Sequence, residues 1–207
     1  SSMFEIFETQ MKEANIQFAK FIETYYENWM KGNSGPVLSH QVFRKFVFPE
    51  LNKHQPTLLL MIDNLRFDQW RTIQPELKKY CKVAREETCF SILPTATQYA
   101  RNAFFAGLTP LEMSNRFPQW WKNDIDEGGK NVHELDFLKA QCERLGMELP
   151  ISYHKITQLN QSQQLIKNLQ NHTHEGLTTV VYNFVDMISH AKTEMEVIKE
   201  LAPDNKA

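Results

Sequence analysis

The strongest constraint on the fold is a strongly apolar run at 178–185 that is rich in β-branched and aromatic residues. The run is too continuous for a half-exposed strand, so it predicts a strand buried on both faces of a sheet. Asp186 follows the run directly, and His190 lies one helical turn further along. A carboxylate and an imidazole placed in this way in the crevice of an open α/β sheet form half of a metal site.

A second apolar run ends in the same way, because residues 57–62 lead directly into Asp63. Parallel strands of a doubly wound sheet end at one edge, so we expect Asp63 and Asp186 to meet there. Two carboxylates in one crevice repel each other unless they are protonated or bridged by a cation, which favours a divalent metal. The alternative is that each aspartate only caps the helix that follows its strand.

Residues 91–107 add a hydroxyl group to this set. They predict an extended entry, a sharp turn and a helix that ends at Gly107. Thr97 would lie at or near the helix N-terminus, where free N–H groups and the helix dipole favour an anion such as a phosphoryl oxygen. A hydroxyl beside a metal can become an alkoxide nucleophile. Alternatively, Thr95 or Thr97 serves only as the N-cap.

Four motifs in this order resemble the PglZ domain of the alkaline phosphatase superfamily, and in particular the effector region of PorX-type response regulators. They are the segments at residues 62–66, 93–102, 127–131 and 182–191. The resemblance runs from about residue 55 to the end of the chain, and four ordered motifs are far more specific than any one of them.

The resemblance implies that Thr97 is the nucleophile and that Asp63 shares one metal ion with it. Asp186 and His190 would then bind a second ion. The implied metal is zinc, with two ions clamping the attacking and leaving oxygens of an in-line displacement at phosphorus. The ligand types also suit manganese or iron.

The implied substrates are small phosphodiesters such as oligonucleotides. Arg101, one helical turn beyond Thr97, or Arg66 would steady a non-bridging oxygen of such a substrate. The alternative for Arg101 is a structural arginine held in a salt bridge.

The resemblance also implies a setting. The chain would be the output region of a two-component response regulator that receives its signal from a sensor kinase and acts in the control of type 9 secretion. The rival hypothesis is a non-catalytic, metal-dependent dimerisation and signalling module that acts through a homodimer and partner proteins.

Compared with the family pattern, the ligand set is incomplete. A complete core also needs a later Asp-His pair and a final histidine, and none follows His190. We therefore expect a piece of a larger protein, with a receiver domain before it and the rest of the metal core after it. The parent would be a zinc-dependent phosphodiesterase, and the piece alone would be inactive.

The first part of the chain has a different pattern. Apolar and aromatic residues recur at steps of three and four between Phe4 and Trp29, which predicts one long amphipathic helix ended by the glycine- and proline-rich residues 31–36. We expect a shorter helix near 39–48. The aromatic stripe would be packing surface for the following domain or a dimer contact. These observations divide the chain into a helical linker, 1–50, and a PglZ domain, 51–207.

The remaining chain alternates between strands and helices, which indicates an α/β fold with right-handed crossovers. We expect an alkaline-phosphatase-like sheet flanked by helices and preceded by the helical linker. Further strands are expected at 82–85, and further helices at 67–79, 135–145, 162–168 and 189–201.

Composition agrees with a cytoplasmic protein that has no membrane partner. Three cysteines without a C-x-x-C pair indicate reduced thiols. No segment reaches the ~20 apolar residues of a membrane span. The net charge of −2 gives no general attraction to nucleic acid.

Overall fold

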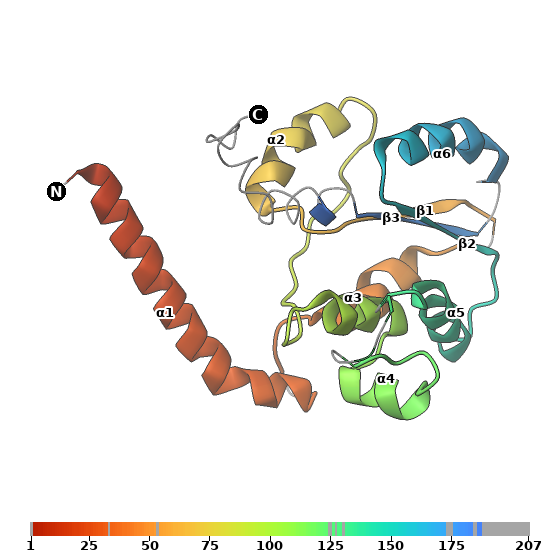
Figure 1. Ribbon diagram of the computed structural model, residues 1–207. Helices are drawn as coiled ribbons and strands as arrows, with labels where there is room; N and C mark the ends of the chain where they lie inside the picture. Colours follow the sequence, from red (N-terminus) through yellow and green to blue (C-terminus); the bar gives the residue numbers. More distant parts are fainter. Residues whose placement is uncertain are drawn as a thin grey trace.

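The architecture is a small parallel sheet with helices on both faces and one long helix standing apart from these layers over most of its length (Figure 1). The computed structural model describes residues 2–32, 34–52, 54–123, 126, 128–129, 131–172, 176–183 and 186–187. The predicted α/β class is therefore confirmed, with a three-stranded sheet flanked by helices.

The sheet has the strand order β1-β3-β2, and both pairings are parallel. β1 (Thr57–Ile62) has the predicted bounds, whereas β3 covers Leu177–Tyr182 and ends three residues earlier than expected. β3 is the central strand and is almost entirely buried, as its apolar run predicted. β2 (Ile151–Ile156) was not predicted, because the apolar-polar alternation of its first four residues is short and is broken at Lys155.

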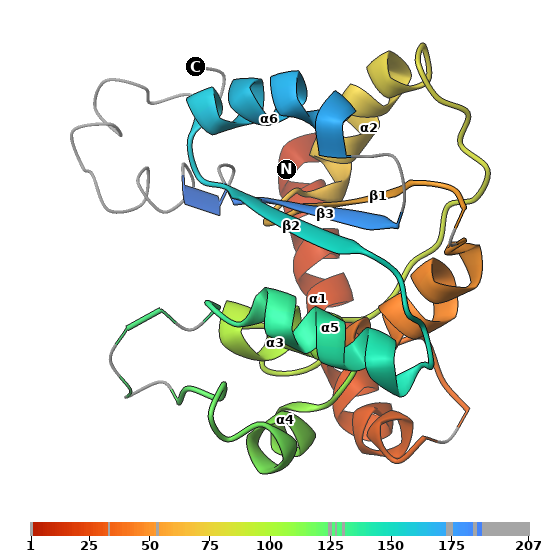
Figure 2. The same ribbon diagram turned by 90° about the vertical axis from the view of Figure 1, so that its right-hand side faces the viewer.

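Helices α2 (Phe67–Leu77) and α6 (Leu159–His172) lie on one side of the sheet, and α3, α4 and α5 lie on the other (Figure 2). α3 spans Thr97–Ala106, α4 spans Pro110–Arg116 and α5 spans Glu134–Arg144. As predicted, α3 ends at a left-handed glycine, Gly107, with φ of 61°. The core between this layer and the sheet includes Phe105, Phe137, Leu138, Leu177 and Val181.

Helix α1 covers Met3–Met30 and confirms the single long helix expected at the start of the chain. A capping box between Ser2 and Glu5 begins it. Only its C-terminal part packs against the body, where Trp29 is buried and lies 5.6 Å from the ring of Phe90. The N-terminal part of the aromatic stripe, which includes Phe7, is exposed.

Two expected elements were wrong, and one helix was not expected. Residues 39–50 form a 3₁₀ turn (Ser39–Gln41), a π-helical turn (Phe43–Val47) and a second 3₁₀ turn (Phe48–Glu50) rather than one α-helix. Residues 82–85 are not a strand, because no neighbouring strand supplies a hydrogen-bonding partner in the described sheet. α4 was missed although Thr109 and Glu112 form a capping box.

The closing helix expected at 189–201 lies outside the described residues. Within the described ranges, no helix combines the length and the apolar character that a membrane crossing requires.

The three cysteines should differ in reactivity. Cys142 is buried, and its burial raises the pKa of the thiol to about 11, whereas Cys81 and Cys89 are exposed. We expect iodoacetamide at mildly alkaline pH to modify Cys81 first, and Cys89 more slowly because partial desolvation raises the pKa of its thiol, while Cys142 stays unmodified. Peptide mass spectrometry measures these rates. In concentrated guanidinium chloride all three should react alike. Rapid modification of Cys142 in the folded protein would contradict the placement of α5.

Candidate active site

The ends of β1 and β3 lie side by side at the carboxyl edge of the sheet. Asp63 directly follows β1, and its backbone N–H donates to the carbonyl of Tyr182 at 3.0 Å. Asn183 directly follows β3, and its N–H donates to the carbonyl of Ile156 at 2.9 Å. The parallel pairing thus continues one residue past the strands, and it places the Asp63 and Asn183 side chains at one edge.

Arg101 connects this edge to the helix layer below it. Its Nη1 donates to Asp63 Oδ2 at 2.5 Å and to Asn183 Oδ1 at 2.6 Å. Its Nε donates to Glu134 Oε1, and the Arg101 side chain is only 6% exposed. One guanidinium group therefore joins the ends of two strands to helix α3, from which it comes, and to helix α5.

Glu134 is the deepest charge of this group, with a side chain that is 1% exposed. Its other oxygen, Oε2, accepts a hydrogen bond from the Tyr153 hydroxyl and lies 3.8 Å from Lys155 Nζ. Burial, together with the charge and hydrogen bond of Glu134, raises the pKa of Tyr153, so the phenol stays protonated and donates. Lys155 also donates to the carbonyl of Asn131 at 3.4 Å, which ties the loop before α5 to β2.

Thr97 is the first residue of α3, after Ala96 as the N-cap, and it is half-buried. The turn before it contains a cis peptide bond between Leu93 and Pro94. Thr97 therefore lies near the helix N-terminus, as predicted. Arg101 follows four residues later, so the two Cα atoms are about 6 Å apart along the helix.

Asp186 is further from its strand than the sequence indicated. Because β3 ends at Tyr182, Asn183 and not Asp186 directly follows the strand. Asp186 and Met187 belong to a short helical turn in which the Met187 N–H donates to the Asn183 carbonyl at 3.1 Å. His190, the other expected ligand, lies outside the described residues.

Arg101 is thus the meeting point of the three segments that carry the candidate residues. It contacts Asp63 directly, it lies one turn from Thr97 on α3, and it contacts Asn183, which bonds to the turn of Asp186. For Arg101 itself, the contacts with Asp63 and Glu134 are those of a salt-bridged structural arginine. No group of three or more His, Cys, Asp or Glu side chains that could hold a metal is found in the part of the chain that the structure describes.

Sequence reasoning missed Glu134, Tyr153, Lys155 and Asn183. Glu134 lies in the first turn of α5, a position where acidic residues usually face solvent, so nothing in the local sequence indicated its burial. Tyr153 and Lys155 belong to the strand that was not predicted. Asn183 had been assigned to the interior of β3.

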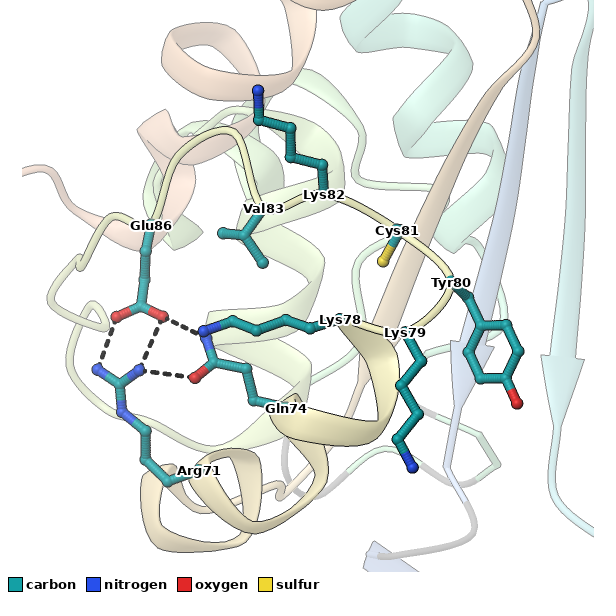
Figure 3. Close-up of a pocket in the computed structure, with 9 residues that line it drawn as sticks. All are labelled: Arg71, Gln74, Lys78, Lys79, Tyr80, Cys81, Lys82, Val83 and Glu86. Carbon is teal, nitrogen blue, oxygen red and sulfur yellow. Dashed lines mark hydrogen bonds and ion pairs between the residues drawn. The ribbon is translucent and has the colours of Figure 1, made fainter.

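A cavity of about 760 Å³ opens elsewhere, between the C-terminal end of α2 and the loop that follows it (Figure 3). Glu86 reaches across from this loop and accepts hydrogen bonds from Arg71 and Gln74. The candidate residues Asp63, Thr97 and Asp186 are not part of its lining, so we assign it no role in the site.

Two family models match the chain. The model of the BREX system PglZ alkaline phosphatase-like domain matches residues 42–207. The chain belongs to this PglZ family. The model of the PorX response regulator linker domain matches residues 1–30, the region of α1. No curated protein matches the chain.

The two matches confirm the resemblance to PglZ proteins of the PorX type. They indicate a response-regulator output region, which implies signalling partners in general, and an alkaline-phosphatase-like domain of a superfamily that generally uses metal ions. The division of the PglZ protein at residue 50 stays a prediction, as do the roles of the site residues.

Substitution of Arg101 should strongly destabilise the PglZ domain. Arg101→Met leaves the buried carboxylate of Glu134 without its main partner, and breaking a buried ion pair in this way costs about 3–5 kcal/mol of unfolding free energy. Urea denaturation followed by circular dichroism measures this change.

The matched control is Arg66→Met, because Arg66 pairs with Asp68 on the surface, where both side chains are about two-thirds exposed. This control should leave the unfolding midpoint nearly unchanged, since exposed pairs are screened by solvent. Equal midpoints for Arg101→Met and Arg66→Met would show that the Arg101 contacts do not stabilise the fold.

Proposed function

We propose that this PglZ protein is a metal-dependent phosphodiesterase or phosphatase that acts on small phosphodiesters such as oligonucleotides. As the output region of a response regulator, it would act under a sensor kinase in the control of type 9 secretion. Family membership supports the class of chemistry, and the residues around Arg101 support its location.

The observation that carries the proposal is the pair of hydrogen bonds from Arg101 Nη1 to Asp63 and Asn183. These bonds hold the ends of β1 and β3 at the first turns of α3, where Thr97 lies. These contacts support a site at this edge that would combine the Asp63 carboxylate, the Thr97 hydroxyl and Asp186. An edge of this kind is where open α/β sheets bind ligands.

The donor set suits divalent metal ions. Arg101 engages Asp63 Oδ2, so Asp63 Oδ1 is the oxygen that would bind a metal, and the Asp63 side chain is 22% exposed at the open edge. Thr97 would share that ion, while Asp186 and His190 would hold a second. Carboxylate, hydroxyl and imidazole ligands suit zinc, and manganese or iron as alternatives. When bound, such ions favour ionisation of a hydroxyl and neutralise charge on phosphoryl oxygens.

Thr97 itself would be the nucleophile. Its Oγ1 would form a bond to phosphorus while the bond from phosphorus to the leaving oxygen breaks on the opposite side. At the first position of α3, the unpaired N–H groups and the positive end of the helix dipole would attract the non-bridging oxygens of the substrate. Arg101 would act mainly by holding Asp63, because its guanidinium is buried among protein acceptors.

Removal of the Thr97 hydroxyl tests the assignment. We expect Thr97→Ala to lower kcat for zinc-dependent hydrolysis of bis-p-nitrophenyl phosphate by the full-length protein roughly 10²-fold or more, because the attacking group is lost. Thr95→Ala is the control, since Thr95 is exposed in the same turn and should keep nearly full activity. Unchanged activity in Thr97→Ala would rule out Thr97 as the nucleophile.

A second candidate function is a non-catalytic, metal-dependent dimerisation and signalling module that binds partner proteins. The exposed stripe of α1 favours it, because Phe4, Phe7 and Met11 remain more than half exposed. This stripe lies within residues 1–30, the part that matches a response-regulator linker. An apolar surface of this length on a helix is typical of a helix-helix contact.

Light scattering with and without zinc tests this second function. If it holds, the full-length protein should form a zinc-dependent dimer, and Phe7→Glu should abolish that dimer by placing a charge in the stripe. Thr9→Glu adds the same charge on the opposite side of α1 and should leave the dimer intact. A monomer under both conditions, together with turnover of phosphodiesters, would contradict the second function and favour the first.

A further inference from the structure

The buried charges beneath the candidate site are balanced in pairs. Among the described residues, the ion pairs of this cluster join the carboxylates of Asp63 and Glu134 to the cations of Arg101 and Lys155. Tyr153 adds no charge, since its phenol stays protonated while it donates to Glu134. The charges of these four described side chains therefore cancel in pairs.

The cluster has one closed end and one open end. Glu134 is 1% exposed and receives Arg101, Tyr153 and Lys155, so it has no opening toward solvent. Asp63 is 22% exposed and lies at the edge of the sheet. A change of charge at the closed end is therefore compensated poorly by water, and it acts on the open end through the Arg101 guanidinium.

Glu134 also fixes the direction of Arg101. The guanidinium donates from Nε to Glu134 and from Nη1 to Asp63. Glu134 therefore sets the plane of the guanidinium, and the same group holds Asp63. Arginine presents its donors in a rigid fork, so a partner on Nε determines where Nη1 points. This contact is what keeps Arg101 on Asp63 Oδ2.

We infer that Glu134 and Lys155 are positioning residues with opposite effects, and that the net charge of the buried cluster sets the affinity of the Asp63 edge for a divalent cation. The inference rests on the proposed function, because it assumes that Asp63 binds a metal. Glu134 strengthens cation binding because its negative charge offsets the positive charge of Arg101. Lys155 weakens cation binding because its positive charge offsets the negative charge of Glu134.

A purely structural cluster would behave differently. Loss of either Glu134 or Lys155 would then loosen the packing between α5 and β2, and both changes would weaken metal binding or leave it unaltered. Only an electrostatic role predicts opposite signs for the two changes. The sign of the change in metal affinity therefore separates an electrostatic role from a structural one, even where both variants lose stability.

The experiment compares Glu134→Gln and Lys155→Met in the metal-stripped full-length protein, with zinc affinity measured by competition against a chelating indicator. A unit charge about 10 Å from a divalent ion, at an effective dielectric constant of about 20, changes the affinity by roughly 10-fold or more. We expect Glu134→Gln to weaken zinc binding by at least that factor. We expect Lys155→Met to tighten zinc binding by a smaller factor, because the Lys155 side chain is 33% exposed and solvent screens part of its charge.

Matched controls are Glu143→Gln and Lys139→Met, which make the same charge changes at exposed positions of α5. Solvent and salt screen these charges, so their zinc affinity should stay within about twofold of the unsubstituted protein. Thermal melting of each metal-free variant identifies any loss of folding. Should Glu134→Gln fail to fold, the predicted tightening in Lys155→Met still decides the question, because Lys155 is one-third exposed.

Three outcomes would overturn the inference. Equal weakening in Glu134→Gln and Lys155→Met would indicate a structural cluster. Unchanged affinity in both, with zinc binding lost in Asp63→Asn, would remove the electrostatic role and leave the proposed function standing. Failure of the unsubstituted protein to bind zinc, manganese or iron would overturn the proposed function and this inference with it.

Discussion

The buried ion pairs of Arg101 are the interaction on which the rest of the site depends. One side chain from α3 reaches the end of β1 through Asp63, the end of β3 through Asn183 and the start of α5 through Glu134. Removing such charges from water is costly, and apolar residues of similar size often stabilise a core as well or better. We therefore attribute to the cluster a positioning role, because it fixes where two strands end relative to the helix that carries Thr97.

Much of the fold could be predicted, because its main elements leave local marks in the sequence. β1 and β3 are continuous apolar runs, and α3 ends at a glycine that adopts positive φ. β2 leaves a weaker mark, because its apolar-polar alternation covers only four residues before Lys155 breaks it. Residues 82–85 favour a strand only weakly, since Lys82 and Ala84 have low β-propensity, and the described sheet provides no partner strand there.

The site residues likewise fall into those that the local sequence indicates and those that depend on tertiary contacts. Asp63 and Thr97 were predicted at the end of β1 and the start of α3, and the structure places them there, because strand ends and helix starts can be read locally. Glu134 could not be found, since its partner Arg101 is 33 positions away in the sequence and the burial of both is a tertiary property. Asn183 was hidden by the length of its own apolar run, which continues past the last hydrogen-bonded strand residue.

The charges of the cluster also affect how the proposed metal-binding edge could fold before a metal ion binds. Carboxylates close together in a low-dielectric interior repel each other unless cations compensate their charge, and small metal domains without such compensation fold only when the ion binds. Here Arg101 and Lys155 supply the compensating charge from within the chain. Because Arg101 engages one oxygen of Asp63, the other can remain a ligand, so the same carboxylate serves the fold with Oδ2 and the proposed ion with Oδ1. A guanidinium suits this division better than an ammonium group, because its fork engages both carboxylates at fixed angles.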